Sequence, residues 1–168
     1  KAEGGEQALS HPEYLAFLSL ILDTDCADLL DIEFFTAGAD LPKLVEQAHS
    51  AGVAVVCSSH DFAKTPPRAE LVCRMVQIQQ AGANLPKLAV MPRCRSDVLE
   101  LLAATAEMAD LHPETPVITM SMGALGAVSR LAGEAFGSAM TFANPGQASA
   151  PGQVSLNIVN EVLDALHL

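Results

Sequence analysis

One lysine, Lys87, lies inside a short apolar run, residues 85–91, of the kind that forms a buried strand. Burial of an ammonium group disfavours its charged form, and the neutral amine that remains is a nucleophile. Such an amine can condense with a ketone to form a Schiff base. The alternative is a lysine whose stem packs at a strand edge while its charge reaches water.

A histidine follows a second apolar run. Residues 53–57 are apolar and continue into Ser58, Ser59, His60 and Asp61, which places an imidazole at the carboxyl end of another predicted strand. Imidazole titrates near neutral pH and can both take and give a proton. A lysine and a histidine on strands of one parallel sheet therefore predict imine chemistry assisted by a proton carrier. A histidine that only fills a strand end is the competing interpretation.

Composition limits the classes of protein to consider. The 168 residues fit one domain, residues 1–168, and half of them are hydrophobic, which excludes a disordered chain. The net charge of −11 argues against nucleic acid and anionic membrane surfaces as partners. No apolar run approaches the roughly 20 residues that span a bilayer. Four cysteines without metal-like or disulfide-like spacing favour a cytoplasmic protein.

Strand-like and helix-like segments alternate along the chain. Ser10, Pro12 and Glu13 form the pattern of a capping box that opens a helix. Thr65 is predicted to cap a later helix with Pro66 and Pro67 in its first turn. The predicted strands are residues 29–35, 53–57, 85–91, 116–122 and a weak one at 139–142. The other predicted helices start at Asp40 and Ser96, cover 129–133, and close the chain around 158–166.

This alternation predicts a parallel sheet with helices outside it. No glycine-rich fingerprint supports an open doubly wound sheet, whereas Asp31 and Glu33 alternate with apolar residues, as on a strand with a polar inner face. A (β/α)₈ barrel needs about 250 residues. We therefore predict an α/β fold of the TIM-barrel family. It would be an incomplete barrel of about five β/α units with a leading helix, lacking the first three strands. A sheet with one wet face is the alternative.

Seven segments in one order resemble type I 3-dehydroquinate dehydratase over nearly the whole chain. They are residues 3–7 (EGGEQ), 31–33 (DIE), 59–66 (SHDFAKTP), 86–89 (PKLA), 120–122 (MSM), 129–138 (SRLAGEAFGS) and 148–153 (ASAPGQ). A lone His-Asp or Pro-Lys pair would be unspecific, but the ordered set is specific. Ser59 departs from the family, which more often has asparagine there.

The resemblance implies a lyase of the shikimate pathway, which leads to chorismate and the aromatic amino acids. It would remove water from 3-dehydroquinate to give 3-dehydroshikimate, with Lys87 as the Schiff-base lysine and His60 as general base and acid. Glu3 would orient His60, and Arg130 would bind the substrate carboxylate. Ser149 and Gln153 would contact the substrate from a lid. The family chemistry needs no cofactor and no metal.

Several further residues are candidates for the walls of the pocket, although core packing explains them equally well: Phe62, Met91, Met120, Met122, Phe142 and Ala150. Asp31 and Glu33 are expected either to balance Lys87 inside the barrel or to contact substrate.

Two other functions stay open at this point. The chain could be an inactive incomplete barrel that needs an N-terminal complement, or a class I aldolase-like enzyme that uses the same imine. A homodimer is one assembly compatible with the sequence.

Overall fold

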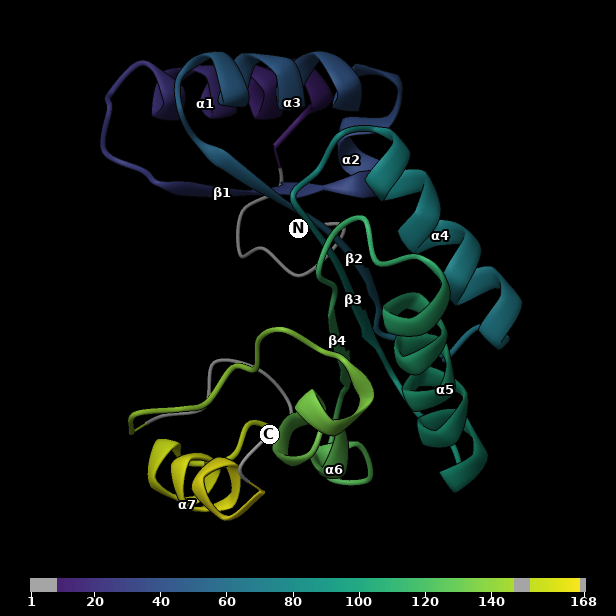
Figure 1. The fold of residues 1–168 in the computed structure, drawn as a ribbon. Helices are drawn as coiled ribbons and strands as arrows, with labels where there is room; N and C mark the ends of the chain where they lie inside the picture. Colours follow the sequence, from purple (N-terminus) through teal and green to yellow (C-terminus); the bar gives the residue numbers. More distant parts are fainter. Residues whose placement is uncertain (1–8, 147–151, 167–168) are drawn as a thin grey trace.

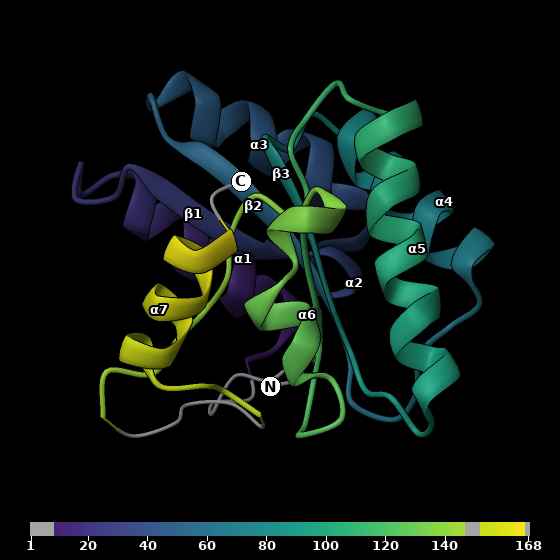
Figure 2. The ribbon, with the colours of Figure 1, turned by 60° about the horizontal axis from the view of Figure 1, so that its bottom comes forward.

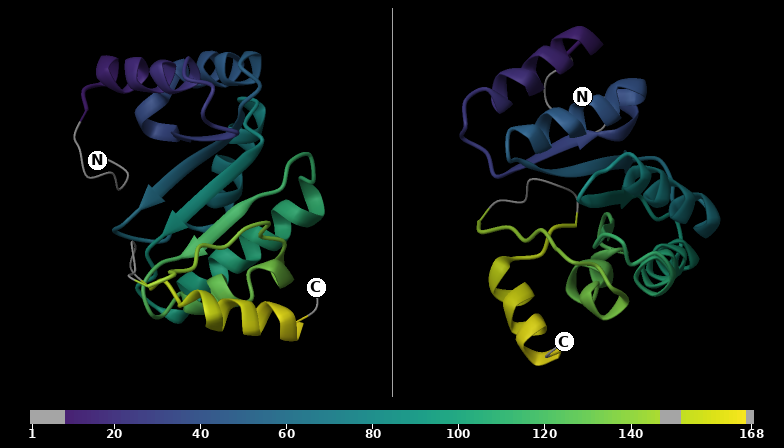
Figure 3. Two further views of the ribbon diagram at one scale, coloured as in Figure 1. Left: turned by 90° about the vertical axis from the view of Figure 1, so that its left-hand side faces the viewer. Right: turned by 45° about the horizontal axis from the view of Figure 1, so that its top comes forward.

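The structure, a computed structural model, describes residues 9–146 and 152–166. Its centre is a four-stranded parallel sheet in the order β1-β2-β3-β4. The strands are β1 (Leu29–Glu33), β2 (Ala54–Asp61), β3 (Leu85–Val90) and β4 (Ile118–Ser121). Figure 3 shows their arrows pointing the same way. The carboxyl ends of the strands therefore meet at one edge of the sheet.

Helices form an arc around one face of this sheet. In Figure 1 the arc runs from α1 and α3 through α4 and α5 to α6 and α7, and Figure 2 shows α6 between α5 and α7. The helices are α1 (His11–Leu22), α2 (Phe34–Ala37), η1 (Gly38–Asp40), α3 (Leu41–Ser50), α4 (Arg68–Gln80), α5 (Arg95–Leu111), α6 (Ala127–Leu131), η2 (Glu134–Phe136) and α7 (Leu156–Leu166). Within the described residues, none of these helices combines the length and the hydropathy needed to cross a membrane.

Alternate residues of each strand point to opposite faces of the sheet. One set packs under the helices: Leu30 and Ile32 contact the core around α1 and α3, and Leu88 and Val90 contact the core around α4 and α5. The other set faces the inner side and forms a separate apolar cluster that includes Val56, Ala89, Ile118, Met120 and Met122. The inner face is the one that carries Lys87, as its alternation with Leu88 and Val90 predicted.

The predicted capping box at the start of α1 is confirmed. The Ser10 backbone N–H donates to Glu13 Oε2 at 2.8 Å, and the Ser10 hydroxyl donates to the same oxygen at 2.6 Å. Pro12 lies in the first helical turn, where its missing N–H costs no hydrogen bond.

The first strand is shorter than predicted. It ends at Glu33, and the aromatic pair that was assigned to it, Phe34 and Phe35, opens the one-turn helix α2. The Thr36 hydroxyl donates to Glu33 Oε2 at 2.7 Å, a link across three residues that stabilises a turn rather than an extended backbone. β-Propensity of the two phenylalanines was therefore overridden by local hydrogen bonding.

The predicted cap of the fourth helix was wrong. Helix α4 starts at Arg68, and its N-cap is Pro67, with an extended backbone (φ −56°, ψ 150°). A residue that precedes a proline is disfavoured in the helical region, so Pro66, which precedes Pro67, does not become the first helical residue and Thr65 does not cap this helix. Two smaller differences are that α5 begins at Arg95, one residue before the predicted start, and that α6 covers Ala127–Leu131 rather than residues 129–133.

The predicted strand at residues 139–142 was also wrong. None of these residues lies in a strand, and the isolated parallel bridge next to them joins Val117 to Ser138, the residue before the segment. The carbonyl groups of the segment are used by side chains: Ser138 Oγ donates to the Met140 carbonyl at 3.3 Å, and Arg130 Nη1 donates to the Phe142 carbonyl at 3.5 Å. One backbone hydrogen bond, from the Ala139 N–H to the Val117 carbonyl at 2.8 Å, remains, but it does not continue into a ladder. The described residues therefore contain four strands of the five predicted.

Candidate active site

Register places the candidate nucleophile and the candidate base on adjacent strands. Lys87 on β3 pairs with Ser58 on β2, and His60 pairs with Ala89. His60 is thus two residues further toward the carboxyl end of the sheet, about 6.6 Å along the strand. Ser58 and His60 are two residues apart on β2, so their side chains lie on the same face of the sheet. Lys87 pairs with Ser58, so its side chain lies on that inner face as well.

Lys87 is buried, with 9% of its surface exposed. Its Nζ donates to Asp31 Oδ2 on β1 at 2.7 Å, and the same nitrogen lies 5.0 Å from the centroid of the Phe142 ring. The ammonium group therefore has a carboxylate on one side and an aromatic ring on another. Both neighbours stabilise positive charge at this nitrogen.

His60 is half-buried at the end of β2 and stacks on Phe62, with ring centroids 6.0 Å apart and an interplanar angle of 9°. The stacked ring fixes the plane of the imidazole near the strand end. Phe62 itself is 46% exposed, so it forms an edge of the site rather than part of the core.

Arg130 reaches the inner face from α6. Its side chain is almost fully buried, and burial lowers the pKa of its guanidinium group. Nη1 lies 3.7 Å from Met120 Sδ and 3.5 Å from the Phe142 carbonyl oxygen. Phe142 therefore contacts both basic side chains, Lys87 through its ring and Arg130 through its carbonyl group.

The junction between β4 and α6 positions Arg130. The Ser121 backbone N–H donates to Ser129 Oγ at 2.8 Å, and Ser129 Oγ donates to the Gly126 carbonyl at 2.7 Å. A Cβ atom at Gly126 would collide with the Ser121 carbonyl oxygen, so only glycine allows the chain to turn this closely. The close turn brings the residue after Ser129 back over the sheet.

The predicted walls of the pocket divide into two groups. Met120 and Met122 are buried in the inner apolar cluster, and Met91 packs against it. Phe62 and Phe142 are more exposed and lie beside His60 and Lys87, respectively. The structure thus brings the aromatic candidates next to the reactive side chains, whereas the methionines belong to the apolar cluster of the inner face.

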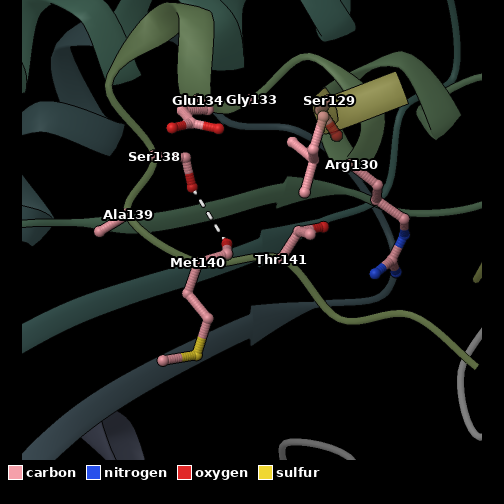
Figure 4. Close-up of a pocket in the computed structure, with 9 residues that line it drawn as sticks. Ser129, Arg130, Gly133, Glu134, Ser138, Ala139, Met140 and Thr141 are labelled. Carbon is pink, nitrogen blue, oxygen red and sulfur yellow. Dashed lines mark hydrogen bonds between the residues drawn. The ribbon is translucent and has the colours of Figure 1, made fainter. Parts of the chain in front are cut away.

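A pocket of about 170 Å³ lies beside Arg130, between α6, η2, residues 138–141 and Leu163 of α7. Figure 4 shows the Arg130 guanidinium group pointing away from Glu134 and Ser138. Of the predicted site residues, Arg130 alone is among those that line this pocket.

One polar residue of the inner face was missed by the sequence analysis. Ser58 is 1% exposed, and its hydroxyl has no hydrogen-bond partner in the described structure. It lies opposite Lys87 in the register of the sheet. Its position two residues before His60 on the same strand was the signal that could have identified it.

Three predicted residues, Glu3, Ser149 and Ala150, lie outside the described residues. Gln153 is half-buried and follows Gly152, whose φ of +75° favours glycine. A Cβ atom at Gly152 would collide with the Gly123 backbone, so this segment packs closely on the turn after β4. Gln153 is thus held near the carboxyl end of the sheet, where His60 also lies.

Within the described ranges, His, Cys, Asp and Glu side chains form no group of three or more that could hold a metal ion. The polar groups at the inner face are instead an amine, an imidazole, a guanidinium group, a carboxylate and a hydroxyl. Such a set suits covalent chemistry on a carbonyl compound, with proton transfer and a cationic anchor for an anionic substrate.

Comparison with known proteins agrees with this geometry. A family model described as type I 3-dehydroquinase matches residues 1–168. The 3-dehydroquinate dehydratase of Salmonella agona is 48% identical over 165 residues, which cover 98% of this chain and 66% of the relative.

Two solved structures are similar in fold as well as sequence. A type I 3-dehydroquinate dehydratase from Clostridium difficile, crystallised with covalently modified comenic acid, has a TM-score of 0.94 and 46% identity. The 3-dehydroquinate dehydratase of Geobacillus kaustophilus has a TM-score of 0.92 and 40% identity. The alignments cover 99% of this chain but 65% and 64% of those chains.

These likenesses confirm the predicted fold class, an α/β fold that forms part of a (β/α)₈ barrel. The chain spans slightly less than two thirds of the length of the relatives it matches. A match of the family model along all 168 residues, together with the shared fold, assigns the sequence: the chain belongs to the type I 3-dehydroquinase family.

Proposed function

We propose that this chain carries the imine-forming part of a 3-dehydroquinate dehydratase, a hydro-lyase of the shikimate pathway. The observation that supports this most directly is the buried Lys87 on the same inner face as His60, on adjacent parallel strands. The family relationship supplies the reaction, and these two side chains supply the groups that the reaction requires.

The first step is condensation. The neutral Lys87 Nζ attacks the ketone carbon of 3-dehydroquinate, the carbonyl oxygen leaves as water after taking up protons, and a protonated imine forms. The positive charge of the imine withdraws electrons from the neighbouring carbon. A proton on that carbon, too weakly acidic in the ketone, becomes acidic enough for a histidine to remove.

The second step is elimination. His60 takes the proton, the electron pair of that C–H bond shifts toward the imine nitrogen, and an enamine forms. The enamine then expels the β-hydroxyl group, which leaves as water with the proton that His60 returns. Hydrolysis of the conjugated imine releases 3-dehydroshikimate and restores the Lys87 amine. Protons and electrons balance without any oxidant, and no cofactor is required.

The remaining predicted residues would bind and orient. Arg130 would hold the substrate carboxylate through two parallel hydrogen bonds, locally opposing the net charge of −11. Glu3 would set the tautomer of His60, as the carboxylate of a catalytic triad does. Ser149 and Gln153 would contact substrate hydroxyls from the segment that follows residue 146 and close over the site. Ala150 would form part of the pocket wall.

Reductive trapping tests this proposal. The 168-residue chain is incubated with 3-dehydroquinate and borohydride, and the adduct is located by intact mass and peptide mapping. We expect a substrate-dependent adduct on Lys87, absent from Lys87→Met and retained in the control Lys43→Met, which changes a lysine of the distant helix α3. A folded chain that gives no adduct on Lys87 contradicts the proposal.

The reaction that follows the imine is tested by product analysis. Ultraviolet absorbance reports the conjugated carbonyl of 3-dehydroshikimate, and cleavage of aldol substrates is assayed in parallel. Dehydration without aldol cleavage supports the dehydratase, whereas aldol cleavage alone would show that the chain is a class I aldolase-like enzyme. Adduct formation without either product would describe an incomplete barrel that needs an N-terminal complement for turnover.

We also propose a cytoplasmic location and a homodimer. The four cysteines, all of them among the described residues, form no disulfide bond, as is usual in a reducing compartment. Phe17 and Leu20 on α1 are 50% and 62% exposed and could be covered by a second copy. Sedimentation velocity of the chain, compared with Leu20→Glu, tests the dimer: a monomer at micromolar concentration in the unsubstituted chain contradicts it.

A further inference from the structure

We propose that Asp31 is the counter-ion of the Lys87 nitrogen, both in the free ammonium and in the protonated imine, an inference that rests on the proposed function. Asp31 Oδ2 accepts a hydrogen bond from Lys87 Nζ at 2.7 Å. The two residues are 56 positions apart in the sequence and meet only because β1 and β3 flank β2 in the sheet.

The environment of this pair is asymmetric. The Lys87 side chain is 11% exposed, whereas the Asp31 side chain is 42% exposed on the outermost strand. Asp31 therefore keeps part of its hydration while it screens a cation that has lost most of its own. A partly hydrated carboxylate in hydrogen-bonding contact is well placed to stabilise a buried positive charge.

The other charged groups on this face of the described structure have different partners. Glu33 accepts a hydrogen bond from Thr36 Oγ1, His60 stacks on Phe62, and the Arg130 guanidinium group contacts Met120 and Phe142. Of the carboxylates described, Asp31 is the one within hydrogen-bonding distance of Lys87. A neutral side chain at residue 31 would thus leave the nitrogen without its ion pair.

The chemistry gives this carboxylate opposite effects on two steps. Attack on a ketone requires the neutral amine, which Asp31 disfavours because it stabilises the ammonium. Proton abstraction requires the protonated imine, which Asp31 favours because its charge is placed at the same nitrogen. Loss of the carboxylate should therefore make the free amine more reactive and the protonated imine scarcer.

Two measurements on Asp31→Asn separate these effects. The first is trace acetylation with acetic anhydride in the absence of substrate, carried out at pH values from 6 to 11. Peptide mapping then gives the reactivity of each lysine, with Lys43 and Lys64 as internal references. We expect Lys87 to be acetylated faster relative to Lys43 and Lys64 in Asp31→Asn than in the unsubstituted chain, because the amine has lost the carboxylate that binds its ammonium form. The second is trapping of the 3-dehydroquinate imine with cyanoborohydride. The amount of adduct formed on Lys87 at pH 9 should fall about tenfold in Asp31→Asn.

Two further variants act as controls. Asp31→Glu restores a carboxylate and should recover most of the trapping at pH 9. Glu33→Gln removes a carboxylate from the same strand and face. The pH dependence of Lys87 acetylation in this variant should be the same as in the unsubstituted chain. Circular dichroism establishes that each variant is folded, and a loss of both acetylation and trapping in folded Asp31→Asn would show a merely structural role and overturn the proposal.

Failure of the inference and failure of the proposed function are distinguishable. If the unsubstituted chain traps 3-dehydroquinate but Asp31→Asn has the same two pH profiles, the proposed function stands and the role of Asp31 is overturned. If Asp31→Asn shifts the acetylation profile but no variant traps 3-dehydroquinate, the proposed function fails, and the role of Asp31 toward the imine fails with it.

Discussion

The Tyr14 hydroxyl oxygen of α1 accepts a hydrogen bond from the Glu33 backbone N–H at 2.8 Å, at the last residue of β1. The leading helix is therefore tied by a side chain to β1, the strand at the edge of the described sheet, where the described residues supply no carbonyl group from a further strand. Burial raises the pKa of Tyr14 to about 12, with the neighbouring Glu33 and Asp31 adding to the effect.

Removal of this hydroxyl should destabilise the attachment of β1. Tyr14→Phe leaves the Glu33 N–H without its acceptor, so we expect the free energy of unfolding to fall by about 1–2 kcal/mol. The folded chain holds Tyr14 neutral to a higher pH than the unfolded chain does. Its contribution is therefore present below pH 10 and lost as the pH rises from 10 toward about 12. Urea unfolding from pH 8 to 11.5 should show a shallower alkaline loss in Tyr14→Phe, and parallel curves would contradict this.

His11 should make stability depend on pH near neutrality. Its Nδ1 is 2.9 Å from the Thr36 carbonyl oxygen and its Nε2 is 2.9 Å from Asp40 Oδ2, two acceptors that only the protonated ring can satisfy together. The hydrogen bond to Asp40, and then that to Thr36, raise the pKa of His11. Stability from this contact is therefore present below the ordinary histidine pKa and lost as the pH rises through the raised value.

The measurement for His11 is urea unfolding between pH 5 and 9. His11→Gln should lose stability at the acidic end and lie close to the unsubstituted chain at the alkaline end. Asp40→Asn should reduce the same pH dependence, and the double variant should show less than the sum of the two single effects. Additive effects would mean that the two side chains act independently.

Arg130 should govern the apparent affinity for an anionic substrate. A bidentate guanidinium–carboxylate contact contributes about 2–3 kcal/mol, so Arg130→Ala should raise the half-saturating concentration of 3-dehydroquinate in the trapping assay by about 30- to 150-fold. Arg130→Lys should recover only part of this, because an ammonium group is a point charge. Arg68→Ala, which breaks an exposed ion pair with Glu107, is the matched control. Its half-saturating concentration of 3-dehydroquinate should equal that of the unsubstituted chain.

Gly126 should be intolerant of any side chain. A Cβ atom there would meet the Ser121 carbonyl oxygen in the turn between β4 and α6, so Gly126→Ala should lower the free energy of unfolding by about 2–3 kcal/mol through forced displacement of the backbone. Because Arg130 follows this turn, substrate trapping should weaken as well. Gly146→Ala, at a position with no atom within 4 Å, is the control. Equal stability of the two variants would show that the turn adjusts freely.

Much of this molecule follows from local patterns in the sequence. Alternation of apolar and polar residues placed Lys87 on the opposite face from Leu88 and Val90, and the packing of those two under α4 and α5 agrees with it. The Ser10–Glu13 capping box predicted the start of α1 correctly. These features depend on residues within one turn or one strand, so short-range periodicity and capping chemistry determine them.

Other features were decided by contacts between distant residues. The ion pair of Lys87 with Asp31 depends on the order of the strands, and the place of Phe142 between Lys87 and Arg130 depends on how the segment after η2 crosses the sheet. The predicted strand at residues 139–142 is absent from the described sheet because side chains from α6 and from Ser138 bind its carbonyl groups. Hydrophobic periodicity carries no information on such hydrogen bonds. The sequence therefore determined the strand faces and the types of reactive groups, whereas the tertiary structure decided which charge and which ring surround the lysine nitrogen.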